Sequence, residues 1–348
     1  MPKPKYIKEL KEYYMNKSTK PTKSPKPTKS PKYGGGDGDD DTFDGDEFDS
    51  IMKYILHKLN DKINTGQGVG QGTTGASKKE KHLIMLYGPP ASGKSIAKKI
   101  MLSKLKIGDS DYIDINLDDI IGNDRKYKSE IEALKKEHGN TSADPSEDIK
   151  KRATNLYFSI RNKANLVFEL LVFITRLYDI SLVVEVTGGT YCSMVWWDNI
   201  LRFFKTKKYT ISLIYPVVSD DKKIVSRADE RGKEIFRFVS SDTIRQSIEG
   251  AKKNIKSIID DSRAMFRKFD NIYIYTNEDA NFLSYAKENK TQELLDLFNK
   301  YILYKKENGK IITQGIEKDF IKEIKRKSNI FYDKQNMPLI PETCGLTY

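Results

Sequence analysis

Residues 83 to 95, "LIMLYGPPASGKS", are the stretch of this chain best suited to hold phosphate groups. An apolar run breaks into glycine and proline, and from Gly88 onward the residues match the pattern G-x-x-x-x-G-K-[ST] in full. Glycines let consecutive backbone N–H groups turn toward phosphate oxygens, and a helix that starts here adds the positive end of its dipole. The pattern therefore favours a nucleotide-phosphate site over a plain glycine turn.

The residue types in this loop also suggest separate roles. The residues expected to surround the phosphates of ATP are Gly88, Pro89, Pro90, Ala91, Ser92, Gly93, Lys94 and Ser95. The Lys94 ammonium should reach the β- and γ-phosphates, and the Ser95 hydroxyl should bind Mg²⁺. ATP and Mg²⁺ are thus the predicted cofactors. The loop alone does not reveal whether the phosphate passes to water or to another molecule.

Two aspartates follow the second strand-like stretch, in "YIDINLDDII". Ligands of α/β sheets bind beyond the carboxyl ends of the strands, and a carboxylate placed there can accept the proton of an attacking hydroxyl. We expect the strand at 111–117 to lie next to the phosphate-loop strand, with Asp118 as the catalytic base. The alternative is that Asp118 and Asp119 cap the next helix, and the two roles can be divided between them.

An acid and three arginines follow the later strands. Glu185 closes the apolar strand of "SLVVEVTGGT", where it resembles a Walker-B acid that orients Mg²⁺ through water or holds an acceptor. Arg227 and Arg231 lie four residues apart on one helical face, and Arg237 follows six residues later. Mobile arginines stabilise the charge on a transferring phosphoryl group. The alternatives are a solvent-facing strand end for Glu185 and a salt-bridged surface helix for the arginines.

Taken together and in this order, the motifs resemble the zeta-toxin family of P-loop kinases. The matching elements are Gly88 to Ser95, Asn116-Leu117-Asp118, Glu185-Val186-Thr187, and Arg227 to Gly232 with Arg237-Phe238-Val239. The resemblance covers roughly residues 82 to 275. It implies that Asp118 activates the acceptor hydroxyl and that Glu185 and Thr187 line the acceptor site. It also implies that Arg231 and Arg237 contact the ATP phosphates from a lid.

The same resemblance implies a class of substrate. The toxins of this family phosphorylate uridine diphosphate N-acetylglucosamine, and related members phosphorylate other small hydroxyl compounds. We therefore expect a small-molecule hydroxyl acceptor such as a nucleotide-sugar. The stretch "DIIGNDRKYKSE" departs from the family because it lacks the basic residue often found three positions after the aspartate. A polynucleotide 5′-hydroxyl kinase and a non-catalytic nucleotide-binding regulatory protein stay open as alternatives.

The order of apolar and amphipathic segments predicts an α/β fold. Strand-like runs lie at 83–87, 111–117, 181–186, 210–217 and 271–275, and helical patterns lie at 94–105, 148–178, 193–206, 220–233 and 241–267. Runs that are apolar throughout suit a parallel sheet covered by helices on both faces, as in P-loop kinases. After the last strand, "TQELLDLFNKYILYKK" is expected to form an amphipathic helix of a C-terminal extension.

Composition divides the chain into five parts. These are a disordered Lys/Pro-rich and acidic tail at 1–45, a helix at 46–64, a flexible linker at 65–81, a kinase domain at 82–290 and a helical C-terminal extension at 291–348. Within the tail, the ten Lys and two Glu of residues 1–32 are balanced by the seven Asp and one Glu of residues 33–50. The net charge of +12 therefore belongs to the remainder, which suits an anionic ligand.

Composition also bears on location. The two cysteines, Cys192 and Cys344, do not make a disulfide framework, so a reducing compartment is expected. The stretch "MPKPKYIKEL" has no apolar h-region, so a secretory signal is not expected, and no apolar stretch is long enough to span a bilayer. The predicted location is the cytoplasm, including that of a virus-infected host cell, because the Lys- and Ile-rich composition suggests an AT-rich genome. The tails do not indicate a protein partner.

Overall fold

The computed structural model describes residues 80–139, 144–189, 191–259 and 268–312. The predicted tail at 1–45, the helix at 46–64, most of the linker at 65–81 and residues 313–348 lie outside the described residues. The strands, in chain order, are β1 His82–Tyr87, β2 Tyr112–Ile115, β3 Ser181–Val186, β4 Thr210–Val217, β5 Asn271–Thr276, β6 Ile302–Glu307 and β7 Lys310–Ile311. The helices are α3 Lys94–Lys104, α4 Leu117–Asn123, α5 Arg125–Glu137, α6 Glu147–Leu177, α7 Tyr191–Thr206, α8 Asp221–Ile235, α9 Ser241–Ile259, α10 Asn281–Lys287 and α11 Thr291–Lys300.

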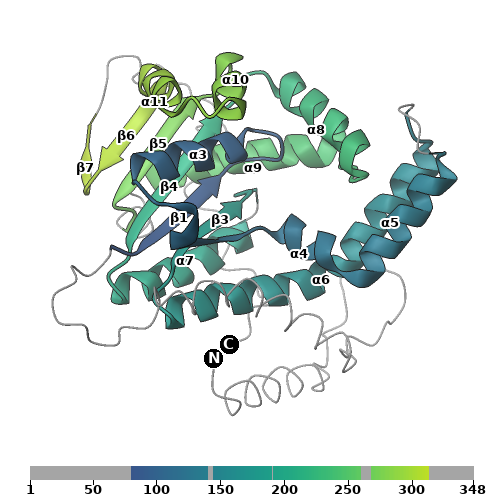
Figure 1. Ribbon diagram of the computed structural model, residues 1–348, viewed down its shortest axis with the longest axis horizontal. Helices are drawn as coiled ribbons and strands as arrows, with labels where there is room; N and C mark the ends of the chain where they lie inside the picture. The colour runs from purple at the N-terminus through teal and green to yellow at the C-terminus, as the bar shows by residue number, and fades with distance from the viewer. Residues whose placement is uncertain (1–79, 140–143, 190, 260–267, 313–348) are drawn as a thin grey trace, which may run out of the picture. The chain divides into compact units, whose positions relative to one another are not determined.

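A seven-stranded sheet in the order β2-β3-β1-β4-β5-β6-β7 forms the centre of these residues (Figure 1). Strands β1 to β5 are parallel, and β6 and β7 add antiparallel strands at one edge. Helices α3, α10 and α11 pack together over one face, while α6 and α7 cover the other face and α7 contacts α9. The predicted α/β class, with helices on both faces of the sheet, is confirmed.

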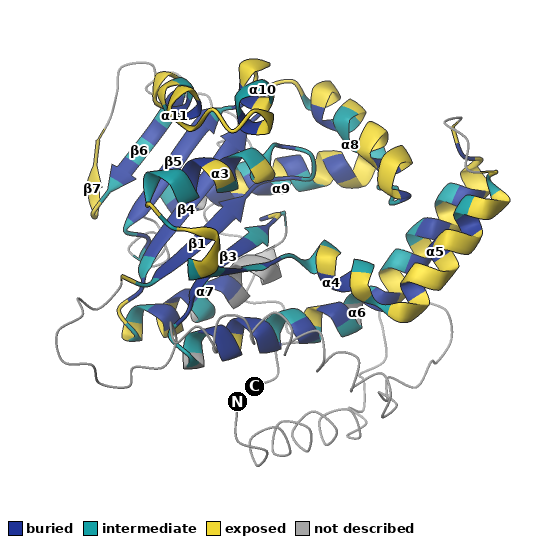
Figure 2. Ribbon diagram, viewed as in Figure 1, coloured by how far each residue is buried: buried dark blue, intermediate teal, exposed yellow. Residues whose placement is uncertain are grey.

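Burial explains why these runs form strands rather than amphipathic elements. Every residue of β1 is buried, and so is nearly every residue of β3, β4 and β5. Figure 2 shows the inner strands as buried throughout, whereas α3, α5 and α6 turn an exposed face outward. A strand covered on both sides is apolar at every position, which is the pattern "HLIMLY" and "SLVVEV" display.

The position of β2 differs from the prediction. The strand before Asp118 was expected beside β1, but β3 lies between them: Leu86 of β1 pairs with Glu185 of β3, and Leu182 of β3 pairs with Ile113 of β2. Adjacent strands are about 4.8 Å apart, so the end of β2 lies roughly 10 Å from the end of β1. This spacing leaves room for a phosphoryl group and an acceptor between the phosphate loop and Asp118.

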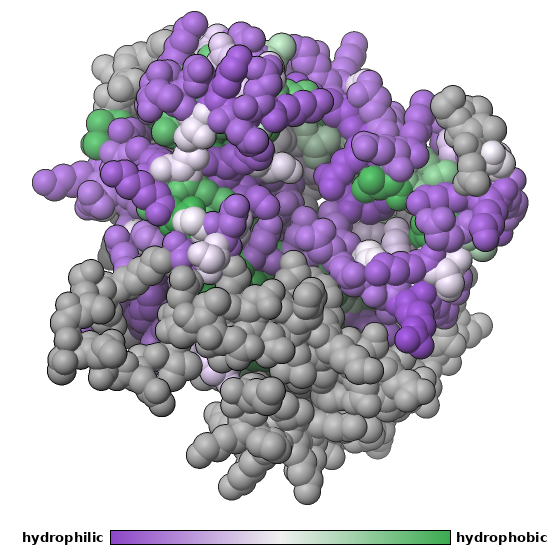
Figure 3. Space-filling view, viewed as in Figure 1, coloured by the Kyte–Doolittle hydropathy of each residue, from purple (hydrophilic) through white to green (hydrophobic). Residues whose placement is uncertain are grey.

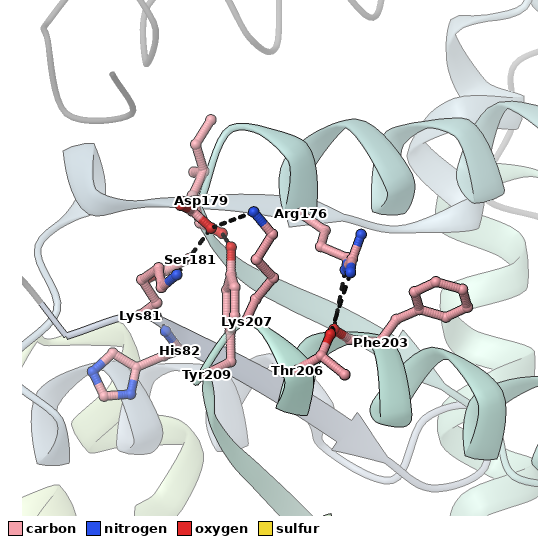
Figure 4. A network of polar contacts seen from close by, with 10 residues as sticks. Lys81, His82, Arg176, Asp179, Ser181, Phe203, Thr206, Lys207 and Tyr209 are labelled. Atoms are coloured by element: carbon pink, nitrogen blue, oxygen red, sulfur yellow. Dashed lines mark hydrogen bonds and ion pairs between the residues drawn. The ribbon is translucent and has the colours of Figure 1, made fainter. Parts of the chain in front are cut away.

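Polar contacts tie the strands together at the opposite, amino-terminal edge of the sheet (Figure 4). Asp179, just before β3, accepts a hydrogen bond from Lys81 at 2.9 Å and lies 4.0 Å from Lys207. The Ser181 hydroxyl accepts from the backbone N–H of His82 at 3.1 Å, and the Tyr209 hydroxyl donates to the carbonyl of residue 180 at 2.9 Å. These contacts fix the amino ends of β1, β3 and β4 and leave the carboxyl ends free for ligands.

The segment after β5 differs from the prediction of a continuous helix. Helix α11 ends at Lys300, and "ILYKKE" then forms β6, in which Ile302, Tyr304 and Lys306 are buried in alternation with half-buried neighbours. The Lys306 ammonium donates to the carbonyl of Phe269 at 2.7 Å, which offsets its burial. The apolar residues of α11 run directly into β6, so the alternation of β6 is hard to recognise in the sequence. The segment forms a strand because it pairs with the open edge of β5.

Glu307, at the end of β6, provides a test of this edge. Burial raises the pKa of its carboxyl, but hydrogen bonds from Lys104, Tyr273 and Lys305 outweigh that effect and lower the pKa to about 2. A lowered folded pKa contributes stability above the unfolded value of 4.5, and that stability is lost as the pH falls toward 2.

We therefore expect Glu307→Gln to be less stable than wild type at pH 7 and the difference to shrink between pH 4.5 and pH 2. Chemical denaturation at a series of pH values measures this. Glu288→Gln, which removes an exposed carboxyl paired with Lys290, is the matched control and should change stability little. A pH-independent loss in Glu307→Gln would contradict the assignment.

Candidate active site

The loop between β1 and α3 has the backbone geometry of a phosphate-binding turn. Gly88, Ala91 and Gly93 have positive φ values of 138°, 58° and 102°, and Gly93 is the N-cap of α3. A Cβ on Gly93 would lie 2.0 Å from the Nδ2 atom of Asn277, so only glycine fits there. Left-handed residues just before a helix N-terminus turn backbone N–H groups toward a common point, which makes an anion-binding concavity.

Lys94 lies folded against this loop. Its ammonium donates to the carbonyls of Gly88 at 3.0 Å and Pro89 at 2.9 Å, and its Nζ atom is 4.0 Å from the Oε2 atom of Glu185. Burial lowers the pKa of Lys94, and the carboxylates of Glu185 and Asp118 oppose that effect. Burial likewise raises the pKa of Glu185, with Lys94 opposing it. Lys94 at the start of α3 and Glu185 near the end of β3 thus form a half-buried charged pair beside the loop.

Asp118 stands on the first turn of α4, not at a strand end as predicted. Strand β2 ends at Ile115, and the side chain of Asn116 caps α4 by accepting from the backbone N–H of Asp118 at 2.9 Å. The capping role considered for the aspartates therefore belongs to Asn116. Asp118 is half-buried, whereas Asp119 is exposed.

The carboxylate of Asp118 is held on both oxygens. Tyr157 of α6 donates its hydroxyl proton to Oδ1 at 2.9 Å, and Arg237 forms an ion pair with Oδ2. The Arg237 guanidinium also lies 5.8 Å from the centre of the Tyr157 ring. Side chains from α4, from α6 and from the segment between α8 and α9 therefore meet at one acid.

The predicted lid, defined here as residues 221–240, consists of helix α8 and the residues that join it to α9. Phe236 ends α8 in a left-handed conformation with φ of 57°, and its side chain is buried. Lys233 pairs with Asp144 at 3.3 Å, and the Thr154 hydroxyl of α6 lies 3.1 Å from the carbonyl oxygen of Phe238, to which it donates. Through these contacts the lid packs against the start of α6.

A cavity of about 1290 Å³ lies between the phosphate loop, α4, α6, the end of β3 and the lid. Of the predicted site residues, those that line it are Pro90, Lys94, Asp118, Glu185, Thr187, Arg231 and Arg237. Arg227 is not among the residues that line this cavity in the described part of the chain. The other phosphate-loop residues form the turn behind Lys94, and Ser95 is exposed on the first turn of α3.

The charges on the cavity wall are mixed. Its basic side chains are the seven residues Lys94, Lys150, Lys151, Arg161, Arg231, Lys233 and Arg237. Its acidic side chains are the six residues Asp118, Asp144, Glu147, Glu169, Glu185 and Asp229. The wider surface is hydrophilic with small, separate apolar patches on the face drawn in Figure 3. The near balance distinguishes this cavity from a basic channel for nucleic acid, in which Lys and Arg dominate.

The residues present fit a magnesium–nucleotide complex. In P-loop proteins the ion is held by the loop hydroxyl and the phosphates, so a dense protein ligand set is not required. Ser95, exposed on the first turn of α3, supplies the loop hydroxyl that this role calls for. Within residues 80–312, apart from the undescribed gaps, no group of three or more His, Cys, Asp or Glu side chains could hold a metal ion.

Several residues at the site were not predicted from the sequence. Tyr157, Phe158 and Arg161 lie on the cavity side of the long helix α6, where a repeat of apolar residues gives no sign of them. Asn277 follows β5 and donates from Nδ2 to the carbonyl of Ser92 at 2.8 Å, so it holds the phosphate loop from behind. Neither contact has a local sequence motif, because the partners are 39 and 185 residues apart.

Helix α9, which follows the lid, packs against the loop after β3. A Cβ on Gly250 of α9 would lie 2.1 Å from the carbonyl oxygen of Gly189, so the helix and the loop touch through their backbones. Asn254 of α9 donates to the carbonyl of Gly188 at 2.6 Å. Thr187 and Gly189 line the cavity, and the loop that carries them is thus fixed by the helix that follows the lid.

The strand–loop–helix turn with a half-buried lysine, and an acid two strands away, form a P-loop arrangement within an α/β fold. No protein-family model matches the chain. The uncharacterized protein L872 of Acanthamoeba polyphaga mimivirus is 27% identical over 216 residues, which are 57% of this chain. The match spans 59% of that relative's length.

Three solved structures show distant similarity in fold. A structure of the PezAT chromosomal toxin–antitoxin system of Streptococcus pneumoniae is 15% identical, covers 81% of this chain and 96% of that chain, and has a TM-score of 0.44. The AvrRxo1-ORF1:-ORF2 structure with ATP is 8% identical over 79% of this chain and 71% of that chain, with a TM-score of 0.42. The Pnkp1/Rnl/Hen1 RNA repair complex is 14% identical over 53% and 49%, with a TM-score of 0.33.

Among the residues that the structure describes, no helix has both the length and the apolar character needed to cross a bilayer.

We predict that Asn277→Ala weakens nucleotide binding, because the buried carbonyl of Ser92 loses its donor and the loop loses its support. An unsatisfied buried carbonyl costs about 1–3 kcal/mol, part of which should appear in the affinity for ATP. Isothermal titration measures this change.

Asn271→Ala is the matched control for Asn277→Ala. Asn271 is buried at the opposite end of β5, where Nδ2 donates to the Ser212 hydroxyl at 3.0 Å. Its replacement should lower the melting temperature by a similar amount and leave ATP affinity unchanged. Equal ATP affinities in the two variants would contradict a supporting role for Asn277.

Proposed function

We propose that this chain is an ATP-dependent phosphotransferase that moves the γ-phosphate of ATP to a hydroxyl of a small molecule. The observation that carries the proposal is that Lys94 of the phosphate loop and Asp118 line the same cavity, on either side of the strand that carries Glu185. A phosphate-binding lysine and a carboxylate on the wall of the same cavity are the two ends of a phosphoryl-transfer reaction.

The phosphates of ATP would lie in the turn from Gly88 to Ser95. Lys94 would exchange its contacts with the carbonyls of Gly88 and Pro89 for contacts with the β- and γ-phosphates. Bound Mg²⁺, held at Ser95, would neutralise charge on the phosphate oxygens. Arg231, exposed on the lid and facing the cavity, is placed to approach the same oxygens.

Asp118 would act on the acceptor. In the transfer, the acceptor oxygen forms a bond to the γ-phosphorus, the bond from that phosphorus to the β–γ bridging oxygen breaks, and the hydroxyl proton passes to the Asp118 carboxylate. ADP leaves with the bridging oxygen. The loose transition state requires mainly alignment and charge stabilisation, so a cavity lined by fixed side chains suits it.

The cavity supports a nucleotide-sugar as the acceptor. Its volume of about 1290 Å³ exceeds the ~300–1,000 Å³ typical of a site for one small ligand, which supports a site that receives more than ATP alone. Phe158 on its wall is 50% exposed, and the Arg161 guanidinium lies 5.8 Å from the centre of that ring. An exposed ring beside an arginine can stack a base or sugar, while the lysines at the start of α6 can hold a diphosphate.

Lys94→Ala should abolish phosphoryl transfer while the fold stays intact. The expected loss is roughly a thousand-fold or more, the scale associated with removal of a phosphate-stabilising charge. Lys99→Ala, on the same helix but bonded to the carbonyl of Ala286, is the control and should retain activity. Unchanged ATP consumption in Lys94→Ala would refute the kinase assignment, and ATP binding without turnover over any acceptor would favour a regulatory nucleotide-binding protein.

Asp118→Asn keeps the size of the side chain but cannot accept a proton, so kcat should fall about 10²- to 10⁴-fold with ATP affinity unchanged. Asp119→Asn is the matched control, because Asp119 is the next residue on the same helical turn and is exposed. Single-turnover phosphorylation and ATP binding, measured on both variants, make the comparison. If both retain full turnover, another group acts as the base.

The acceptor class can be tested directly. We expect transfer from ATP to uridine diphosphate N-acetylglucosamine and none to a 5′-hydroxyl oligonucleotide, because the cavity wall balances acidic and basic side chains. Phe158→Ala should raise the KM for the sugar nucleotide and leave the KM for ATP unchanged. Efficient phosphorylation of the oligonucleotide would establish the polynucleotide kinase instead.

A further inference from the structure

Tyr157 makes a contact that the reaction outlined above does not use. Its hydroxyl donates to Oδ1 of Asp118 at 2.9 Å, from the middle of α6, while Oδ2 of the same carboxylate is paired with Arg237 of the lid. The two oxygens of the candidate base are therefore not equivalent. One is held by a long helix that packs on the sheet, and the other is held by the lid.

Tyr157, which donates to Oδ1, is fixed by its packing and keeps its hydroxyl proton. The Tyr157 ring packs edge to face on Phe158 with the ring centres 5.6 Å apart, and Arg161 lies 5.9 Å from its centre. Burial raises the pKa of the Tyr157 hydroxyl well above its usual value, and the negative charge of Asp118 raises it further. The hydroxyl is therefore a permanent donor at neutral pH.

The Oδ2 atom of Asp118 is paired with a residue of the lid, Arg237. Arg237 lies just beyond the left-handed end of α8, within the lid, and Arg231 on the same lid faces the cavity. A guanidinium drawn toward the phosphates of ATP would turn N–H groups that now face the carboxylate toward the phosphate oxygens. Tyr157 is on α6 and is not carried by such a movement.

We propose that Tyr157 is a positioning residue that fixes Oδ1 of Asp118, so that Oδ2 is the oxygen that takes the acceptor proton once ATP draws Arg237 away. The inference rests on the proposed function. During transfer the acceptor O–H bond breaks as its oxygen bonds to the γ-phosphorus, and the proton moves to Oδ2, while Oδ1 continues to accept from Tyr157. Arg237 thus stays paired with Oδ2 of Asp118 until the nucleotide binds.

The first test is kinetic and uses Tyr157→Phe, which keeps the ring and its packing and removes the hydroxyl. We expect kcat to fall about ten- to a hundred-fold, the scale of a small misplacement of a reacting group, with the KM and binding constant for ATP unchanged. In the Asp118→Asn background the same substitution should cause no further loss, because the hydroxyl acts only through that carboxylate. If Tyr157 had only a structural role, Tyr157→Phe would lower kcat by the same factor in the wild-type and the Asp118→Asn backgrounds.

Tyr301→Phe is the matched control. Tyr301 also donates its hydroxyl to an aspartate, Oδ2 of Asp279, at 3.0 Å, and neither residue lines the cavity. Its replacement should leave kcat unchanged. A Tyr157→Phe variant with the turnover of an active wild type would overturn the positioning role alone, whereas a wild-type chain that transfers no phosphate to any acceptor would refute the proposed function.

A second measurement separates the two partners of Asp118. Double-mutant cycles on the melting temperature pair Asp118→Ala, which removes both oxygens, with Tyr157→Phe and with Arg237→Gln, each with and without saturating Mg·ATP. Both pairs should be non-additive without nucleotide. With Mg·ATP the coupling to Tyr157 should persist and the coupling to Arg237 should disappear. Loss of the Tyr157 coupling, or an unchanged Arg237 coupling, would overturn the proposal.

Discussion

The insertion of β3 between β1 and β2 is the constraint on which the rest of the site depends. Parallel strands present their carboxyl ends at one edge, so the order β2-β3-β1 places Asp118, Glu185 and the phosphate loop along that edge in turn. With strands about 4.8 Å apart, the ends of β1 and β2 are separated by two strand spacings, which leaves room for a phosphoryl group and an acceptor between them. If β2 adjoined β1, that space would not exist.

A second constraint is the close packing behind the phosphate loop. Gly93 touches Asn277, and the left-handed Ala91 is held in a conformation that costs free energy outside glycine. The hydrogen bond from Asn277 to the carbonyl of Ser92 ties this turn to the end of β5. Because β5 is buried on both faces, the loop gains its shape from the core of the sheet.

The sequence predicted the parts of this site that have local signals. The phosphate loop is a contiguous motif, and the strands that end near Asp118 and Glu185 are apolar runs long enough to recognise. The order of the strands was wrong because adjacency in sequence gives no information about the crossover through α6. The prediction of a helix over "YILYKK" was wrong because the pairing of β6 with the free edge of β5 is a long-range event.

Residues whose role depends on distant partners escaped prediction for the same physical reason. Tyr157 lies in a 31-residue helix whose apolar repeat is accounted for by packing, so its hydroxyl carries no pattern of its own. Arg227, by contrast, fitted a helical spacing with Arg231, yet in the described part of the chain it does not line the cavity. The spacing of two residues on a helix predicts that they share a face. Which of them lines the cavity depends on how α8 is placed in the fold.

Helix α6 contacts the sheet, the candidate base and the lid. It packs on β2 and β3, holds Asp118 through Tyr157, and receives the lid through the hydrogen bond from Thr154 to the carbonyl of Phe238. Beyond the lid, α9 touches the loop after β3 through Gly250, so the lid is connected to both walls of the cavity. The lid therefore borders the helix that holds the candidate base and, through α9, the loop after β3, while Tyr157 itself stays on α6.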